Sequence, residues 1–221
     1  MRILAFSDIH GAYKKVNEIL TKESAYDLIL IVGDLTTRGS PREAQDAIKL
    51  FQSHGKPQGD KPLLAVAGNM DPRELDDTFD SLGISINAKG VVREKVGFFG
   101  VSASPFTPMH TPYEIPEEEI SLRAEKGWVD VVTAQWKIFA PHAPPRDTKV
   151  DVITGGVHVG STAVREFVEK HQPDVVVCGH IHEARGVDTI GKTKIVNCGP
   201  AGRGYYVVIE VGAEVTIETK G

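Results

Sequence analysis

The fold is decided near the start of the chain, where residues 3–34 read ILAFSDIHGAYKKVNEILTKESAYDLILIVGD. Two short apolar runs, Ile3–Phe6 and Leu28–Val32, have the length and continuous hydrophobicity of strands buried on both faces. Between them, Tyr13–Thr21 places apolar residues at helical spacing. Each apolar run is followed within two residues by an aspartate. The stretch therefore predicts a strand, a helix and a second strand, with acidic side chains at the strand ends.

The same alternation continues along the chain. Further apolar runs predict buried strands at Leu63–Val66, Phe98–Val101, Lys137–Ala140 and Val175–Cys178. Helical spacing is found at Pro41–Phe51, at about 118–135 and at Ser161–His171, with candidate N-caps at Ser40 and at Ser161 or Gly160. Alternating strands and helices indicate an α/β fold.

The C-terminal part has a different pattern. From Arg185 to Thr219, Thr and Val alternate without a helical period, and the runs are broken near Gly191 and Gly212. This pattern favours antiparallel hairpins that complete a sheet. No linker or repeat divides the chain, so we expect one domain over residues 1–221, with a Pro-rich surface loop or lid at about 102–117.

Composition narrows the class of protein. A chain of 221 residues with 41% hydrophobic content can bury one substantial core. A net charge of -5 argues against stable nucleic-acid binding, which needs a surplus of Lys and Arg on one face. No apolar run approaches the length of a membrane span or a signal peptide, and two cysteines give no disulfide framework. We expect a cytoplasmic protein that does not enter a membrane.

Potential metal ligands stand directly after the predicted strands. In an open α/β sheet the loops at the carboxyl ends of the strands converge on one crevice, so ligands far apart in sequence can meet there. His nitrogens with carboxylate and amide oxygens suit Mn, Fe, Zn or Ni, and we favour Mn. The seven candidate ligands are Asp8, His10, Asp34, Asn69, His142, His180 and His182.

Two divalent ions held there, bridged by Asp34, would bind a phosphoryl oxygen and lower the pKa of a bridging water. The sequence thus predicts hydrolysis of phosphoric esters by a two-metal-activated hydroxide, with Asp34 and Asn69 at the catalytic centre. The substrate expected is a small phosphorylated compound, and a nucleotide-like one would suit the site.

The ligand blocks resemble the motifs of the calcineurin-like metallophosphoesterases. The resemblance covers about residues 1–200 and implies a four-layer α/β/β/α sandwich. It implies that Asp8, His10, Asp34 and His182 hold one metal, and that Asp34, Asn69, His142 and His180 hold the other. The small size resembles stand-alone phosphodiesterases more than protein phosphatases. The matching blocks, in order, are Asp8-Ile9-His10, Gly33-Asp34, Gly68-Asn69-Met70-Asp71, His142 and Gly179-His180-Ile181-His182.

The chain departs from the family pattern at Met70, where the family usually has a histidine that protonates the leaving oxygen. Met70 either packs under the metals or leaves the site without a proton donor on that side. Asp71, which would orient such a histidine, is then expected to be only a helix cap. His158 lies in a glycine-rich entry to a helix and has either a structural role or a catalytic one, as a substrate contact or replacement acid.

Other side chains carry weaker hypotheses. His54 and His171 end predicted helices, where a solvated surface position is expected. Phe106 and Tyr113 in the Pro-rich loop could stack on a nucleobase or aryl leaving group, or could simply be exposed loop residues. Cys178 and Cys198 are expected to be small buried residues.

Two other functions remain open from the sequence. The chain could be a phosphomonoesterase or protein phosphatase, or a non-catalytic interaction scaffold that shares the fold. The complete set of seven ligands favours an enzyme over a scaffold, because a binding surface has no need to keep them all in register.

Overall fold

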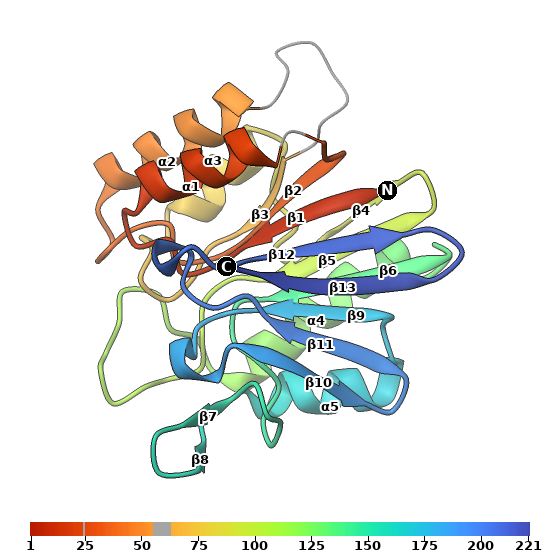
Figure 1. Cartoon of the computed structure of the whole chain (residues 1–221). Helices are drawn as coiled ribbons and strands as arrows, with labels where there is room; N and C mark the ends of the chain where they lie inside the picture. Colours follow the sequence, from red (N-terminus) through yellow and green to blue (C-terminus); the bar gives the residue numbers. More distant parts are fainter. Residues whose placement is uncertain (24, 55–62) are drawn as a thin grey trace.

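The computed structural model describes residues 1–23, 25–54 and 63–221 and contains two large sheets packed against each other (Figure 1). The first sheet has the strand order β13-β12-β1-β2-β3, with β1 at Arg2–Phe6, β2 at Leu28–Val32, β3 at Leu63–Val66, β12 at Tyr206–Val211 and β13 at Val215–Lys220. The second has the order β10-β11-β9-β6-β5-β4, with β4 at Gly90–Arg93, β5 at Val96–Val101, β6 at Trp136–Pro141, β9 at Val175–Cys178, β10 at Gly186–Ile190 and β11 at Thr193–Asn197.

Helices cover the outer faces of both sheets. α1, α2 and α3 lie on the side of the first sheet, and α4 and α5 lie on the side of the second (Figure 1). This arrangement confirms the four-layer α/β/β/α sandwich. The helices are α1 at Tyr13–Lys22, α2 at Pro41–His54, α3 at Leu75–Ser81, α4 at Glu117–Val131 and α5 at Thr162–His171, with short 3-10 turns η1 at His182–Ala184 and η2 at Ala201–Arg203.

The continuous apolar runs form strands because both of their faces are buried. In β1, Ile3 and Ala5 point into the core between the sheets, while Leu4 and Phe6 point toward the helices. All four side chains are fully buried. Burial of apolar surface contributes about 25 cal/mol per Å², so such two-sided strands supply much of the driving force for folding.

Element positions agree closely with the sequence predictions, and the N-cap of α5 is Ser161, whose Oγ accepts from Val164 N at 3.1 Å. The C-terminal prediction needs a correction, because the two hairpins do not complete one sheet. β10 and β11 extend the second sheet, whereas β12 and β13 form one edge of the first. The intervening turn at η2 carries the chain from one sheet to the other.

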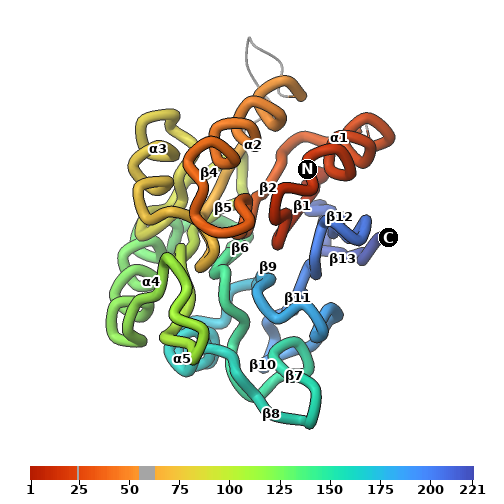
Figure 2. The backbone as a smooth tube through the Cα atoms, turned by 90° about the vertical axis from the view of Figure 1, so that its left-hand side faces the viewer, coloured from red at the N-terminus to blue at the C-terminus, as the bar shows by residue number. Residues whose placement is uncertain are grey.

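A small hairpin of β7 at Val152–Ile153 and β8 at Val157–His158 lies outside both sheets. Figure 2 shows this hairpin and the chain that leads into α4 on the side of the molecule turned toward the viewer. Neither feature was predicted as regular structure, since β7 and β8 are too short to show a period. Within the described residues, no helix has the length and apolar character needed to cross a membrane.

Candidate metal centre

All seven predicted ligands lie at the carboxyl ends of strands, as the sequence analysis expected. Asp8 follows β1, Asp34 follows β2, and His180 follows β9. At these positions the backbone is left-handed, with φ of 52° at Asp8, 56° at Asp34 and 68° at His180. Left-handed backbone at a residue other than glycine costs on the order of 1–3 kcal/mol and persists where the surroundings over-determine it. The strand ends therefore carry strain at the residues that face one another.

Glycines beside the ligands allow the chains to approach closely. A Cβ at Gly179 would lie 1.8 Å from Ser7 Oγ and 2.4 Å from Asp8 Oδ2. A Cβ at Gly68 would lie 2.1 Å from Asp34 Oδ1. These distances leave no room for any side chain. Glycine is therefore required at Gly179, before His180, and at Gly68, before Asn69, for the strand ends to approach each other.

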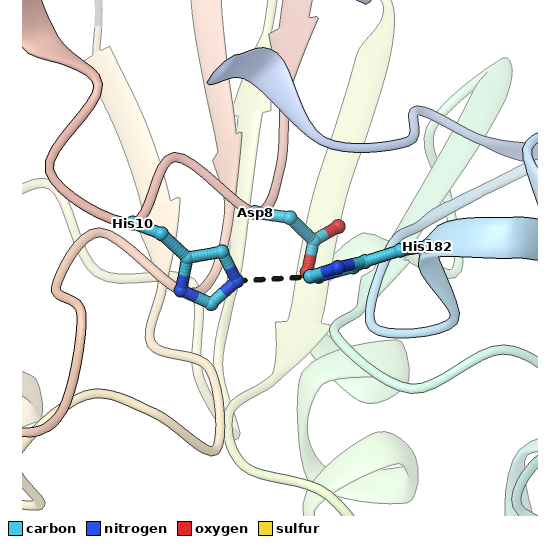
Figure 3. Close-up of side chains that lie close together, drawn as sticks. All are labelled: Asp8, His10 and His182. Carbon is cyan, nitrogen blue, oxygen red and sulfur yellow. Dashed lines mark hydrogen bonds and ion pairs between the residues drawn. The ribbon is translucent and has the colours of Figure 1, made fainter. Parts of the chain in front are cut away.

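The ligand side chains form two overlapping groups. His10 Nε2 lies 3.2 Å from His182 Nε2, which lies 3.3 Å from Asp8 Oδ1, so these three residues form the first group (Figure 3). Asp8 also belongs to a second, buried group with Asp34 and His142. In each group the potential ligand atoms lie within 4.8 Å of one another, which is close enough to surround one cation.

Asp34 and Asn69 connect these groups. Asp34 Oδ2 lies 3.5 Å from His10 Nε2, and Asp34 Oδ1 lies 3.5 Å from His142 Nε2, so one carboxylate spans both groups. Asn69 Oδ1 lies 3.0 Å from His142 Nε2 and 2.8 Å from His180 Nδ1. The structure thus brings all seven predicted ligands into one continuous cluster.

The ring hydrogen bonds show what the cluster can bind. His10 Nδ1 lies 3.1 Å from Thr36 O, and His142 Nδ1 lies 2.8 Å from Val32 O. A carbonyl only accepts, so each Nδ1 carries a proton, and the neutral ring presents the lone pair of Nε2 to the cluster. At His142 that nitrogen faces Asn69 Oδ1 and Asp34 Oδ1, so a positive charge is needed between the nitrogen and these oxygens.

The raised pKa of His142 also shows that its surroundings favour a positive charge. Burial lowers this pKa, but the negative charges of Asp34 and Asp8 and a hydrogen bond to Asp34 raise it to about 9. The surrounding oxygens therefore favour a cation, and a divalent metal would supply that charge in place of the ring proton. The residues present fit a divalent metal ion.

Two further pKa values describe groups ready to act as ligands. Burial raises the pKa of Asp8, but a hydrogen bond from His182 and the charge of His142 lower it to about 2. Burial and the charge of His142 lower the pKa of His180 to about 4. At neutral pH Asp8 is therefore ionised and His180 is neutral, which are the forms that bind metals.

Asp71 has a different role from the predicted helix cap. Its fully buried carboxylate accepts hydrogen bonds from Leu35 N at 3.2 Å, Thr36 N at 2.8 Å and Gly68 N at 2.9 Å. Helix α3 begins only at Leu75. Asp71 ties the loop after β2 to the loop after β3, so the cap prediction is wrong.

Met70 holds the cluster through its backbone. Its amide donates to Asp34 Oδ1 at 2.7 Å, and its carbonyl accepts from Gly39 N at 2.6 Å and from Thr36 Oγ1 at 2.8 Å. Its side chain lines the cavity beside the cluster. A thioether has no proton to donate, so residue 70 provides no acid.

The cluster opens into a cavity of about 810 Å³. One wall comes from the Pro-rich loop, where Phe106 and Met109 are 70% and 75% exposed. Another part of the lining comes from segments around the β7–β8 hairpin, including Arg146 and His158. A cavity of this size accommodates a small organic ligand of about nucleotide size.

The Pro-rich loop is internally bonded. Glu114 Oε1 accepts from Thr107 Oγ1 at 2.6 Å and from Thr111 N at 2.8 Å, and Tyr113 N donates to Asn69 O at 3.0 Å. The prediction of an exposed Tyr113 is wrong, because this side chain is 1% exposed. Its hydroxyl donates to Asp76 Oδ2 at 2.5 Å, so Tyr113 anchors the loop and does not face a ligand.

The remaining predicted residues are placed as follows. His171 is packed against Phe167 and Trp128 with its Nε2 2.9 Å from Glu125 Oε1, so the expectation of a solvated position is wrong. Cys178 and Cys198 are both buried and unpaired, as expected. His158 lies outside the ligand cluster but lines the same cavity.

Sequence reasoning missed Arg146, Glu183 and Asp151 near this cavity. Arg146 and Glu183 line it directly, and Asp151 lies behind His158, with its Oδ1 2.7 Å from His158 Nδ1. The only available signal was the presence of Asp151 and His158 on either side of a Gly-Gly turn, which suggests a cross-hairpin pair.

The four-layer fold with a His, Asp and Asn cluster at its strand ends defines a metallophosphoesterase. The chain belongs to the calcineurin-like phosphoesterases, because the sequence model of that family matches residues 1–184. It is 32% identical over 212 residues to the uncharacterized protein MJ1162 of Methanocaldococcus jannaschii, with 94% of this chain and 91% of that protein covered.

Solved structures share the fold at lower sequence identity. TT1561 of Thermus thermophilus matches with a TM-score of 0.74 and 18% identity over 100% of this chain and 98% of that one. A putative 5'-nucleotidase from Staphylococcus aureus matches with a TM-score of 0.60 and 15% identity. That match covers 99% of this chain and 52% of the 5'-nucleotidase.

Proposed function

We propose that this protein hydrolyses phosphodiesters with the help of two divalent metal ions, Mn being the favoured metal. Asp8, His10, Asp34 and His182 would hold one ion, and Asp34, Asn69, His142 and His180 the other. Bound there, the ions would supply positive charge for the phosphoryl oxygens and a hydroxide nucleophile at neutral pH. The observation that carries this proposal is the continuous seven-residue cluster, five of whose residues line the cavity.

The chain's own residues prepare this site before a substrate arrives. Thr36 O and Val32 O fix the ring orientations of His10 and His142, which keeps each Nε2 directed into the cluster. The amide of Met70 orients Asp34. Such pre-orientation lowers the entropic cost of assembling the reacting groups.

The charge of the cavity supports a diester over a monoester. Among the described residues that line it, Arg146 is the one permanent cation, while Glu117 and Glu183 contribute carboxylates. A diester carries one negative charge, whereas a monoester dianion carries two and would need more compensation. The sparse positive charge therefore favours the diester.

The apolar wall supports an aryl or nucleoside group as one arm of the ester. Phe106 and Met109 present large exposed apolar surfaces on a loop that Glu114 holds in shape. Burying such surface against a flat ring contributes about 25 cal/mol per Å². The same apolar surface agrees with the nucleotide-like substrate expected from the sequence.

We also propose a cytoplasmic location, and the two buried, unpaired cysteines agree with it.

The test compares two aryl substrates that share a leaving group. Protein loaded with Mn would be assayed with bis(4-nitrophenyl) phosphate and 4-nitrophenyl phosphate before and after chelation, alongside elemental analysis. We expect two ions per chain, a kcat/KM for the diester that exceeds that for the monoester by about tenfold or more, and loss of both activities on chelation. Metal binding without hydrolysis would support the scaffold alternative, and a preference for the monoester would support a phosphatase.

A further inference from the structure

A buried carboxylate lies behind the part of the cavity lining that the β7–β8 hairpin supplies. Asp151 is 0% exposed. Its Oδ1 accepts from Thr148 N at 2.8 Å, and its Oδ2 accepts from Asp147 N at 3.1 Å and from Gly160 N at 3.0 Å. Its Oδ1 also lies 2.7 Å from His158 Nδ1. Three backbone amides thus fix this carboxylate so that it faces one imidazole ring.

This pair spans the β7–β8 hairpin. His158 is paired across the hairpin with Val152, the residue next to Asp151. Because Asp151 accepts, His158 Nδ1 carries a proton, and Nε2 has no hydrogen-bond partner among the described residues, so a second proton on Nε2 is available for transfer. The side chain of His158 is 37% exposed and lines the cavity, so a bound substrate can reach it.

The hairpin is joined to the loop that carries two metal ligands. The side-chain amide of Asn197 donates to Val150 O at 3.2 Å and to Ile181 O at 2.9 Å. Val150 precedes Asp151, and Ile181 lies between His180 and His182. A single buried side chain therefore fixes the position of the Asp151–His158 pair relative to the metal centre.

We infer that His158 donates a proton to the leaving oxygen of the substrate, with Asp151 as its positioning residue. This inference rests on the proposed phosphodiesterase function. Met70 cannot act as a general acid, and the inference gives this role to His158 of the β7–β8 hairpin.

The chemical step balances without a further reactant. The hydroxide oxygen forms the new P–O bond, and the bond to the leaving group breaks with its electron pair on the leaving oxygen. The ring starts doubly protonated, with Nδ1–H donating to Asp151, and the proton on Nε2 moves to the leaving oxygen, which gives an alcohol and a phosphomonoester. The neutral ring then regains a proton from solvent, and Asp151 stabilises the charged ring at the start of the next cycle.

The position of the pair suits this role. In an in-line displacement the leaving oxygen departs on the side of phosphorus opposite the nucleophile, so its proton donor has to come from a part of the cavity other than the ligand cluster. His158 lines the same cavity as the ligands His10, Asp34 and His182, so a substrate bound to the ligands can reach it, whereas Met70 has no proton to give.

Other charged groups line the cavity near the pair. Arg146 and Glu183 both line it, and Glu183 Oε1 accepts from Thr154 N in the hairpin turn at 3.4 Å. Glu117 also lines the cavity, but its carboxylate accepts from Thr162 N at 3.0 Å and Ala163 N at 3.1 Å at the start of α5. Asp151 is thus the carboxylate that holds His158.

The kinetic test uses leaving groups of different basicity in metal-loaded protein. The variants are His158→Gln, Asp151→Asn and the control His54→Gln, a surface histidine that contacts Asn17. An acid matters most for a basic leaving group, so His158→Gln should lower kcat/KM for a diester with an alkyl leaving group by about 10²–10³-fold. The 4-nitrophenyl diester, which needs no acid, should change by less than about threefold, and His54→Gln should change neither.

Two readouts separate this role from a structural one. The fall of kcat/KM at alkaline pH for the alkyl substrate should vanish in His158→Gln and move to lower pH in Asp151→Asn, because the charged ring loses its carboxylate partner. Imidazole NMR of zinc-loaded protein should show one ring whose Nδ1 proton signal shifts in Asp151→Asn and is absent in His158→Gln. Metal content should stay at the wild-type level in both.

Several results would overturn the inference. An equal loss on both substrates, loss of bound metal, or an effect on KM alone would show that the pair has a structural or binding role. Absence of hydrolysis in the wild type would instead refute the proposed function. Asp34→Asn serves as the control for the proposed function. It should lose metal and activity on both substrates alike, and a variant that keeps both would count against the metal-dependent hydrolysis and not against the role of His158.

Discussion

The metal cluster and the outer wall of the cavity are built by different means. The cluster is made by strand ends whose backbone is strained and whose neighbouring glycines let the chains touch. The outer wall is made by a loop and a small hairpin that short-range side-chain hydrogen bonds hold in shape, through Glu114 and Asp151. The comparison teaches that the geometry of the ligand cluster depends on the whole fold, whereas the shape of the outer wall depends on local bonding that can change separately.

The largest expected effect is the removal of the carboxylate that spans both ligand groups. Asp34→Ala should lower kcat/KM for an aryl diester by about 10³-fold or more and reduce bound metal, because both proposed ions would lose a ligand. His182→Ala should weaken one ion more than the other. Elemental analysis with kinetics would check this, and a fully active Asp34→Ala protein with two ions would refute the shared-ligand assignment.

A second prediction tests the close contact of the strand ends. Gly179→Ala places a Cβ 1.8 Å from Ser7 Oγ, and we expect the free energy of unfolding to fall by about 3 kcal/mol. Gly212→Ala is the matched control, since no atom lies within 4 Å of its Cβ, and it should change stability by less than about 0.5 kcal/mol. Urea denaturation of both variants measures the difference, and equal stability would contradict the packing argument.

A third prediction concerns the carboxylate that supports the hairpin. Burial raises the pKa of Asp151, but hydrogen bonds from His158, Thr148 N and Gly160 N lower it below the ordinary 3.8. Its contribution to stability is therefore fully present above about pH 4. It is lost as the pH falls through the lower folded-state value.

Asp151→Asn should accordingly reduce the free energy of unfolding by about 1–3 kcal/mol at pH 7, and the difference from wild type should shrink as the pH falls below about 4. The exposed neighbour Asp147→Asn serves as the control. Denaturation curves at neutral and acidic pH give the measurement. A deficit that persists unchanged in acid would argue against a charge-dependent role.

A smaller effect is expected at the apolar wall. Phe106→Ala should raise KM for an aryl diester by up to about tenfold, because the removed surface contacts substrate and not metal. kcat and metal content should stay the same. Val129→Ala removes an apolar side chain of similar exposure, 69%, that does not line the cavity, and should leave KM unchanged. Loss of metal in Phe106→Ala would place the loop within the metal centre.

The smallest effect should follow from restoring a histidine at residue 70. In the wild type, Met70→His should change kcat/KM by less than about threefold, since His158 already serves as donor. In the His158→Gln background the gain on an alkyl diester should be larger. A gain of more than about tenfold in the wild type would show that no other acid acts in the cavity.

The sequence predicted the cluster well because its signals are local. Each ligand follows an apolar run directly, and the backbone topology alone brings such positions together. Asp71 could not be assigned correctly, because its three partners lie on the loops after two different strands and only the fold reveals them. Tyr113 was misjudged for a similar reason, since the loop that carries it turns back onto Asn69.

Other errors came from contacts between elements. His171 ends a helix, but Trp128 of α4 and Phe167 of α5 cover it. The C-terminal hairpins were recognised from their alternation, yet an alternating pattern does not say which sheet a hairpin joins. Helix α3 was missed because Leu75 and Phe79 are its only buried apolar residues, too few to establish a period.

The strand order of the first sheet has a consequence for how the protein is made. β1 lies between β2 and β12, and Ala201 N donates to Ser7 O at 3.1 Å, directly before Asp8. All seven ligands have been synthesised once residue 182 leaves the ribosome, but the first sheet cannot close until β12 and β13 emerge as well. Pairing over such long sequence separation is slow. Metal loading should therefore be a late event, after translation of the final strands, and a nascent chain that ends at residue 184 would carry every ligand without holding them in place.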